Sequence, residues 1–151
     1  MKLHTNNRAH LDDFIQLNEA WIRRYFALED SDRALAANPG RIIDAGGYVF
    51  SLEVAGAVVG VCALFNEGDG RYELARMAVD EASRGQGYGD VLIEAALDRL
   101  RAIGAKRVHL LSNSQLTAAL GLYRKHGFVV ESEGCHPVYQ RCDVVMARAV
   151  G

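Results

Sequence analysis

The chain has 151 residues, of which 50% are hydrophobic and 24% charged, as is typical of a globular domain with its own core. The net charge of −2 excludes a general attraction to nucleic acid or anionic membranes, so any anion site must be local. The longest apolar stretch, residues 54–65, is too short to span a bilayer, and the N-terminus lacks a signal-peptide core. We therefore expect a single cytoplasmic domain, residues 1–151, that binds neither nucleic acid nor membrane.

Helical and strand patterns divide the first half of the chain into five elements. Helical spacing of apolar residues over 11–28 predicts a first helix, with Asn18 on its apolar face. Residues 30–37 predict a second helix, with Asp30 or Ser31 as its N-cap. Three β-rich runs then predict an antiparallel meander over residues 47–54, 57–65 and 71–79, separated by turn sequences at residues 55–56 and 66–70.

The second half predicts a crossover between parallel strands. Apolar residues recur every three or four positions over 91–103, which indicates a helix that begins near Gly87 and ends at Gly104. A strand over 106–112 follows, and strand–helix–strand units place parallel strands side by side. A helix over 114–126 and strands over 128–132 and 142–149 complete a mixed α/β sandwich.

The sequence RGQGYG, from Arg84 to Gly89, lies between the third strand of the meander and the crossover helix. The first backbone N–H groups of a helix have no intrahelical partner, and the helix dipole adds positive charge there. Glycines let the backbone approach a ligand closely, so this segment suits a pyrophosphate. A tight turn without a ligand is the alternative, and the six residues alone do not decide between the two. The dinucleotide fingerprint GxGxxG and the P-loop are both absent.

Three segments together resemble the GNAT superfamily of acetyl-CoA-dependent N-acetyltransferases. RGQGYG matches the family signature Q/R-x-x-G-x-G/A, YELARMAV (residues 72–79) resembles the family's fourth strand, and LYRKHGF (residues 122–128) resembles its late helix and following turn. The resemblance covers nearly the whole chain in element order. It implies a mostly antiparallel, twisted sheet of about seven strands with a βαβ crossover and splayed central strands, flanked by about four helices.

The resemblance also implies acetyl-CoA as co-substrate, and the residues themselves lead us to expect no metal. The pyrophosphate would lie on the backbone amides of the loop, and the pantetheine arm would pair with the backbone of the fourth strand and enter a gap beside residues 108–112. Asn113 is a further candidate contact, although Leu116 stands where the family's commoner NxxAxxLY pattern has asparagine, and a helix cap is its alternative role. The predicted cofactor residues are Met77, Ala78, Val79, Arg84, Gly85, Gln86, Gly87, Tyr88, Gly89 and Asn113.

Two side chains are candidates for acid–base catalysis. Tyr123 lies in LYRKHGF, where many family members carry a tyrosine that protonates the coenzyme thiolate; packing on an apolar helix face is the alternative. Glu73 lies in the fourth strand, near the position of a general-base glutamate in the histone acetyltransferase branch; a solvent-facing glutamate paired with Arg71 or Arg76 is the alternative. His109 is interpreted as an ordinary strand residue.

The resemblance places the acceptor between the last loop and the region that contains Glu29, Asp30 and Asp32, which could attract a cationic amine or simply cap and solvate a helix. Cys135, His136 and Cys142 lack a fourth ligand at zinc spacing, and the odd number of cysteines without a CxxC pair indicates a reducing compartment rather than a disulfide scaffold.

We expect acetyl transfer to a primary amine by direct attack in a ternary complex, with a small molecule or a protein as the amine acceptor. The alternatives are a non-catalytic acyl-CoA-binding sensor and a structural domain in which RGQGYG is only a turn. A homodimer is also open, because strand-mediated dimers are common in the family.

Overall fold

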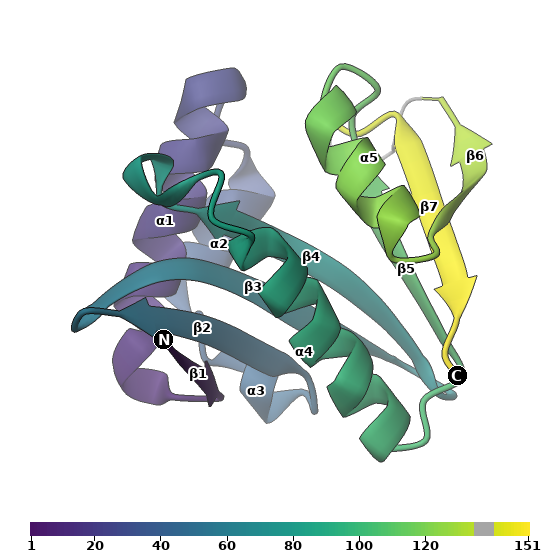
Figure 1. Cartoon of the computed structure of the whole chain (residues 1–151), viewed down its shortest axis with the longest axis horizontal. Helices are drawn as coiled ribbons and strands as arrows, with labels where there is room; N and C mark the ends of the chain where they lie inside the picture. Colours follow the sequence, from purple (N-terminus) through teal and green to yellow (C-terminus); the bar gives the residue numbers. More distant parts are fainter. Residues whose placement is uncertain (135–140) are drawn as a thin grey trace.

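A computed structural model describes residues 1–134 and 141–151 of the chain. Its centre is a seven-stranded sheet with the order β1-β2-β3-β4-β5-β7-β6, in which every neighbouring pair is antiparallel except β4 and β5 (Figure 1). The mixed α/β fold with a mostly antiparallel sheet and one crossover is therefore confirmed. The strands are β1 (Lys2–Thr5), β2 (Tyr48–Val54), β3 (Ala57–Gly68), β4 (Arg71–Val79), β5 (Arg107–Ser112), β6 (Val129–Glu133) and β7 (Val144–Ala149).

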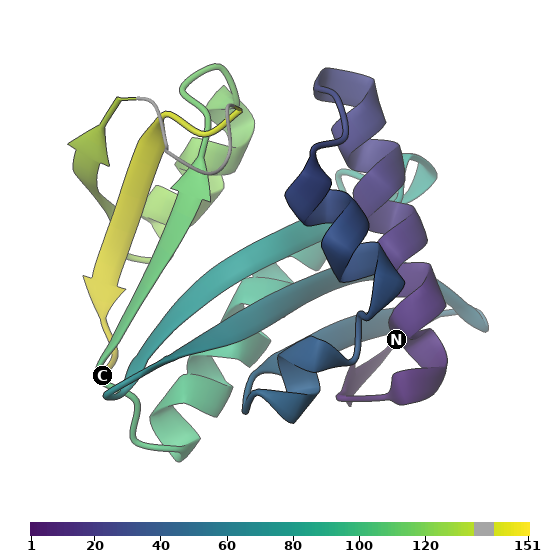
Figure 2. The same cartoon turned by 180° about the vertical axis from the view of Figure 1, so that it is seen from behind.

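Helices cover both faces of the sheet and divide the core in two. In Figure 1 α4 crosses in front of β2, β3 and β4, and Figure 2 shows α1, α2 and α3 on the opposite face. One apolar cluster lies between the sheet and α4 and α5, and a second lies under α1, α2 and α3. The helices are α1 (Leu11–Tyr25), α2 (Asp30–Ala37), α3 (Arg41–Asp44), α4 (Tyr88–Ala102) and α5 (Thr117–Lys125), with short 3-10 turns η1 (Arg8–His10) and η2 (Glu81–Ser83).

The main departures from the sequence-based expectations occur at element ends. The N-cap of α2 is Glu29, not Asp30 or Ser31, because Glu29 and Asp32 form a capping box around the first turn. The helix expected from residue 114 begins only at Thr117, after a turn in which Asn113 Oδ1 accepts a hydrogen bond from the Gln115 N–H. β3 extends to Gly68, three residues beyond the predicted end, because β4 continues to pair with it.

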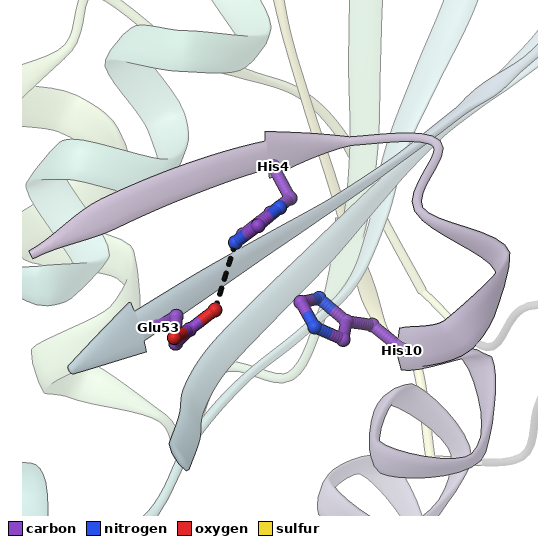
Figure 3. Close-up of side chains that lie close together, drawn as sticks. All are labelled: His4, His10 and Glu53. Atoms are coloured by element: carbon purple, nitrogen blue, oxygen red, sulfur yellow. Dashed lines mark hydrogen bonds and ion pairs between the residues drawn. The ribbon is translucent and has the colours of Figure 1, made fainter. Parts of the chain in front are cut away.

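The N-terminal strand β1 was not predicted, because it is short and polar. It joins the sheet through an antiparallel ladder to β2, and side chains reinforce the attachment. Figure 3 shows the His4 Nε2–Glu53 Oε1 contact of 2.9 Å with His10 beside it, and His10 Nδ1 lies 2.7 Å from the hydroxyl of the buried Ser51. His4 Nδ1 also lies 3.3 Å from the amide of Asn7. These hydrogen bonds account for the clustering of the two histidines.

The parallel pairing between β4 and β5 extends over three residue pairs only, Arg71↔Arg107, Tyr72↔Val108 and Glu73↔His109. Beyond these pairs the two strands diverge, as Figure 1 shows toward the top of the view. The predicted splay of the central strands is therefore present, and it begins at Glu73.

The chain packs closely against neighbouring backbone at Gly47, just before β2, and a substitution there tests this packing. A Cβ atom there would lie 2.3 Å from the Leu64 carbonyl oxygen and 2.9 Å from that of Ile42, and backbone cannot move away cheaply. We expect Gly47→Ala to lower the free energy of unfolding by roughly 1–3 kcal/mol, measured by urea denaturation. The control is Gly121→Ala in α5, where a Cβ has nothing within 4 Å and helix propensity favours alanine. If Gly47→Ala were as stable as Gly121→Ala, the close packing of backbone around Gly47 would be contradicted.

Candidate active site

A cavity of about 480 Å³ occupies the space between the diverging ends of β4 and β5. The second half of β4 forms one wall, and the loop before α4 forms one end. Side chains from α1 and α5 complete the lining together with Asn113, Arg141 and Cys142. The cavity thus brings together most of the residues that the sequence singled out, which lie far apart along the chain.

The glycine segment lies at one end of this cavity with its backbone open. Gly85 and Gly87 have φ angles of +77° and +81°, and a Cβ at either position would meet nothing within 4 Å. Gly87 is the N-cap of the 15-residue helix α4, so the free N–H groups of the first turn and the positive end of the helix dipole lie at the cavity. This arrangement can bind an anion such as a pyrophosphate.

Two side chains of the segment, Gln86 and Arg84, are not placed as free phosphate contacts in the cavity. Gln86 is exposed and is not among the lining residues. Arg84 lines the cavity, but its guanidinium donates a 2.8 Å hydrogen bond to the Tyr25 hydroxyl of α1. The positive charge of Arg84 is therefore held beside the loop by another element.

A β-bulge shapes the wall that β4 contributes. Val61 and Ala63 of β3 pair with Ala78 and Ala75, so two residues of β4 stand opposite one of β3. Arg76, one of those two, has a φ of +58°, which is strained for a residue with a side chain. Met77 is the second bulge residue, and with Ala78 and Val79, which follow it, it lines the cavity where β4 has no strand partner on the β5 side.

Asn18 holds this bulge from α1. Its amide Nδ2 donates to the carbonyl of Phe14, one turn earlier, at 2.9 Å and to the carbonyl of Arg76 at 3.0 Å. Asn18 is 5% exposed, and a buried amide of this kind is expensive unless it is hydrogen-bonded. The sequence signal was a single polar residue within the apolar stripe of α1, although sequence reasoning gave it no role.

Tyr123 lies on α5 and lines the cavity beside Leu122. Its ring packs edge-on against Phe128 at 6.2 Å, so the packing role proposed as the alternative is real. Within the described part of the chain the phenol has no hydrogen-bond partner, which leaves it available to a ligand. Burial raises the pKa of Tyr123 to about 12, so the phenol keeps its proton at neutral pH.

Glu73 lies where the splay begins, and its side chain is 15% exposed. Burial, together with the negative charge of Glu67, raises the pKa of Glu73 to about 7, while Arg76 acts in the opposite direction. A carboxylate that titrates near neutral pH is suited to take and release a proton.

Arg141 forms the centre of an ion network on the cavity wall that sequence reasoning missed. Its two terminal nitrogens each lie 2.7 Å from one oxygen of Asp32, and Nη1 also lies 2.8 Å from Glu29 Oε2. Arg76 Nη1 contacts the same Asp32 carboxylate at 2.5 Å. The two carboxylates expected to attract a cationic acceptor are therefore paired with arginines, and Asp30 is exposed outside the network.

Asn113 and Cys142 also line the cavity. The Asn113 amide donates to the Arg141 carbonyl at 2.8 Å, so the structure gives this side chain a role in holding the backbone at Arg141. Burial raises the pKa of the Cys142 thiol to about 11, with Arg141 opposing the shift, which keeps the thiol protonated and weakly nucleophilic. Cys135 and His136 lie outside the described residues.

The model of the acetyltransferase (GNAT) family matches residues 9–128, which include the glycine loop, the bulged strand and Tyr123. The chain belongs to this family. A curated relative, the mycothiol acetyltransferase of Corynebacterium glutamicum strain R, is 36% identical over 69 residues, which are 46% of this chain and 23% of that protein. The chain therefore spans only a fraction of that relative's length.

Solved structures of GNAT acetyltransferases share the whole fold. An acetyltransferase of the GNAT family from Staphylococcus aureus Mu50 matches with a TM-score of 0.87 and 16% identity over 99% of both chains. A GNAT superfamily phosphinothricin acetyltransferase from Sinorhizobium meliloti, in complex with AcCoA, matches with a TM-score of 0.81 and 18% identity over 99% of this chain and 88% of that chain. Within the described residues, no helix is both long and apolar enough to cross a membrane.

The Asp32 network predicts a pH dependence of stability. Burial alone would raise the pKa of Asp32, but hydrogen bonds from Arg141 and the Glu29 backbone, aided by Arg76, lower it to about 2. The pKa of Asp32 is lower in the folded state than in the unfolded state, so its ionised form stabilises the fold. This stabilisation, about 2 kcal/mol, is fully present above pH 4 and is lost as the pH falls toward 2. We expect Asp32→Asn to be less stable at neutral pH and to lack this acid-dependent loss in urea denaturation series. Asp30→Asn, a fully exposed change on the same helix, should retain it, and equal pH slopes for all three proteins would refute the assignment.

Proposed function

We propose that this GNAT-family chain transfers an acetyl group from acetyl-CoA to a primary amine by direct attack in a ternary complex. The observation that supports this most strongly is the cavity in the splay, with an anion-receptive loop at one end and Glu73 and Tyr123 on its walls. A cavity that served coenzyme binding alone would not need two proton-handling groups within it.

In this proposal the coenzyme enters along the glycine loop. The pyrophosphate binds the backbone amides from Arg84 to Gly89, and the amide groups of the pantetheine arm pair with the backbone of Met77, Ala78 and Val79. The missing β5 partner along this part of β4 leaves main-chain groups for such pairing. The acetyl thioester then lies beside the bulge, where a backbone amide near Met77 or Ala78 stabilises the oxyanion.

The acid–base chemistry follows from the two pKa values. Glu73, with a pKa of about 7, takes a proton from the acceptor ammonium and leaves the neutral amine as nucleophile. The amine nitrogen bonds to the thioester carbon, the C–S bond breaks, and the departing thiolate takes the proton of Tyr123. The second amine proton restores the phenol. The balance is ammonium plus thioester giving amide, thiol and one proton released.

Among the described residues, two of the three carboxylates expected beside the acceptor are already paired with Arg141. Glu29 and Asp32 are paired with Arg141, so they do not act as unpaired anions that select a polycation. The relatives named above differ in the acceptors that their names give. We therefore propose a small-molecule or protein amine without assigning one.

Coenzyme binding and turnover test the proposal in two steps. We expect saturating coenzyme A to raise the unfolding temperature, because a ligand that binds only the folded state stabilises it. We expect acetyl-CoA with a panel of primary amines to release free thiol. No thermal shift would refute the cofactor site, and a shift without thiol release on any amine would favour a non-catalytic acyl-CoA sensor.

Removal of the Tyr123 hydroxyl tests the proposed acid. Tyr123→Phe keeps the ring that packs on Phe128, so the fold should be unchanged. We expect kcat to fall by roughly 10²-fold, with the KM for acetyl-CoA nearly constant, because the proton transfer to the thiolate is lost. Thiol-release kinetics measure both values. An unchanged kcat would leave Tyr123 with a packing role only.

A further inference from the structure

Three titratable side chains from neighbouring strands form a row that runs out of the cavity. Glu73 of β4 lines the cavity and is 15% exposed, His109 of β5 is 25% exposed, and Glu67 of β3 is 40% exposed. His109 Nε2 lies 4.0 Å from Glu73 Oε1, and His109 Nδ1 lies 3.2 Å from Glu67 Oε1. Exposure thus increases along the row from the cavity to the surface.

Strand geometry places each member of this row. Glu73 and His109 are the last residue pair of the parallel ladder, so their side chains are neighbours on one face of the sheet. On the other side of β4, Asn66 pairs with Tyr72 and Gly68 pairs with Arg71, which leaves Glu67 as the extra residue of a bulge. A bulge redirects the side chain it carries, and here Glu67 reaches His109 across β4.

We propose that His109 and Glu67 relay to solvent the proton that Glu73 takes from the acceptor ammonium, a role that rests on the function proposed above. His109 accepts the proton from Glu73 at Nε2 and releases the proton on Nδ1 to Glu67, which passes it to water. The imidazole returns to its first tautomer by exchange with solvent. One proton leaves for each amide formed, as the overall reaction requires.

The two ring nitrogens of His109 contact different carboxylates, which is the geometry that a relay requires. One ligand atom from each of the three side chains also lies within 4.8 Å of the other two, a spacing that could hold a cation, but the relay needs only the two contacts that His109 makes through its separate nitrogens. The 3.2 Å contact is a direct ion-pair or hydrogen-bond distance, and the 4.0 Å gap is one that a single bridging water can span. A partly exposed pair such as Glu67 and His109 adds little to stability on its own.

The charges around Glu73 suit repeated proton uptake and release. Burial and Glu67 favour its neutral form, and Arg76 favours the anion. Cys142, which also interacts electrostatically with Glu73, stays a neutral thiol because burial raises its pKa to about 11. His109 and Glu67 do not line the cavity and are partly exposed, so a coenzyme and an acceptor that fill the cavity leave this route to solvent open.

The test compares His109→Gln with His4→Gln, a matched control in which a partly buried histidine also contacts a glutamate on the next strand. We expect kcat for thiol release to fall by roughly tenfold or more in His109→Gln, with the KM for acetyl-CoA unchanged, because proton removal becomes limiting. Added imidazole should restore the rate, and His4→Gln should keep the wild-type rate. A wild-type kcat in His109→Gln, or a loss that imidazole does not restore, would overturn the relay.

Glu67→Gln gives a second readout that folding defects cannot imitate. Loss of the neighbouring negative charge lowers the pKa of Glu73, so the ascending limb of the pH profile of kcat/KM should move to lower pH. An unmoved limb would overturn the coupling of Glu67 to the base. If the wild-type protein binds acetyl-CoA but acetylates no amine, the proposed function fails and the relay fails with it. If it is active and only the histidine test is negative, the relay alone fails.

Discussion

The structure depends on the early end of one strand pairing. If β4 and β5 stayed parallel and hydrogen-bonded beyond Glu73 and His109, the sheet would be continuous and the cavity would not exist. The separation leaves the second half of β4 without a strand partner on the β5 side. The same separation supplies a slot lined by backbone groups, in which an extended, amide-containing ligand can replace the missing strand.

Two β-bulges near Glu73, one in β4 and one in β3, also shape the site. At Arg76 the chain adopts a left-handed conformation that costs of order 1–3 kcal/mol, and the buried amide of Asn18 offsets it by a hydrogen bond to the strained carbonyl. At Glu67 the extra residue redirects a carboxylate toward β5. Both irregularities lie next to groups to which we assign chemistry, as bulges near functional sites often do.

Local sequence patterns predicted most of the helices and strands. The features that they did not predict depend on contacts between residues far apart in the chain. The bounds of β4 and the start of the helix after RGQGYG follow from β-propensity and from glycine, both of which act locally. β1 depends on a ladder to a strand about fifty positions away, and no pattern within its four residues reveals it. The role of Arg141 could not be predicted from local sequence either, because its partner Asp32 lies 109 positions away in the chain.

The site residues divide in the same way. Motif position makes Glu73 and Tyr123 candidates, but the properties that suit them to the opposite roles proposed for them come from burial and from the charges around them. Burial favours the neutral form of both, yet from ordinary values of 4.5 and 10.0 it moves the carboxyl to about 7 and the phenol to about 12. One group can therefore exchange a proton with its surroundings near neutral pH, while the other gives up its proton only to a strong base such as a departing thiolate. A single apolar cavity, with Glu67 as the only acidic neighbour that raises the pKa of Glu73 among the described residues, is enough to separate the pKa of the proposed base from that of the proposed acid.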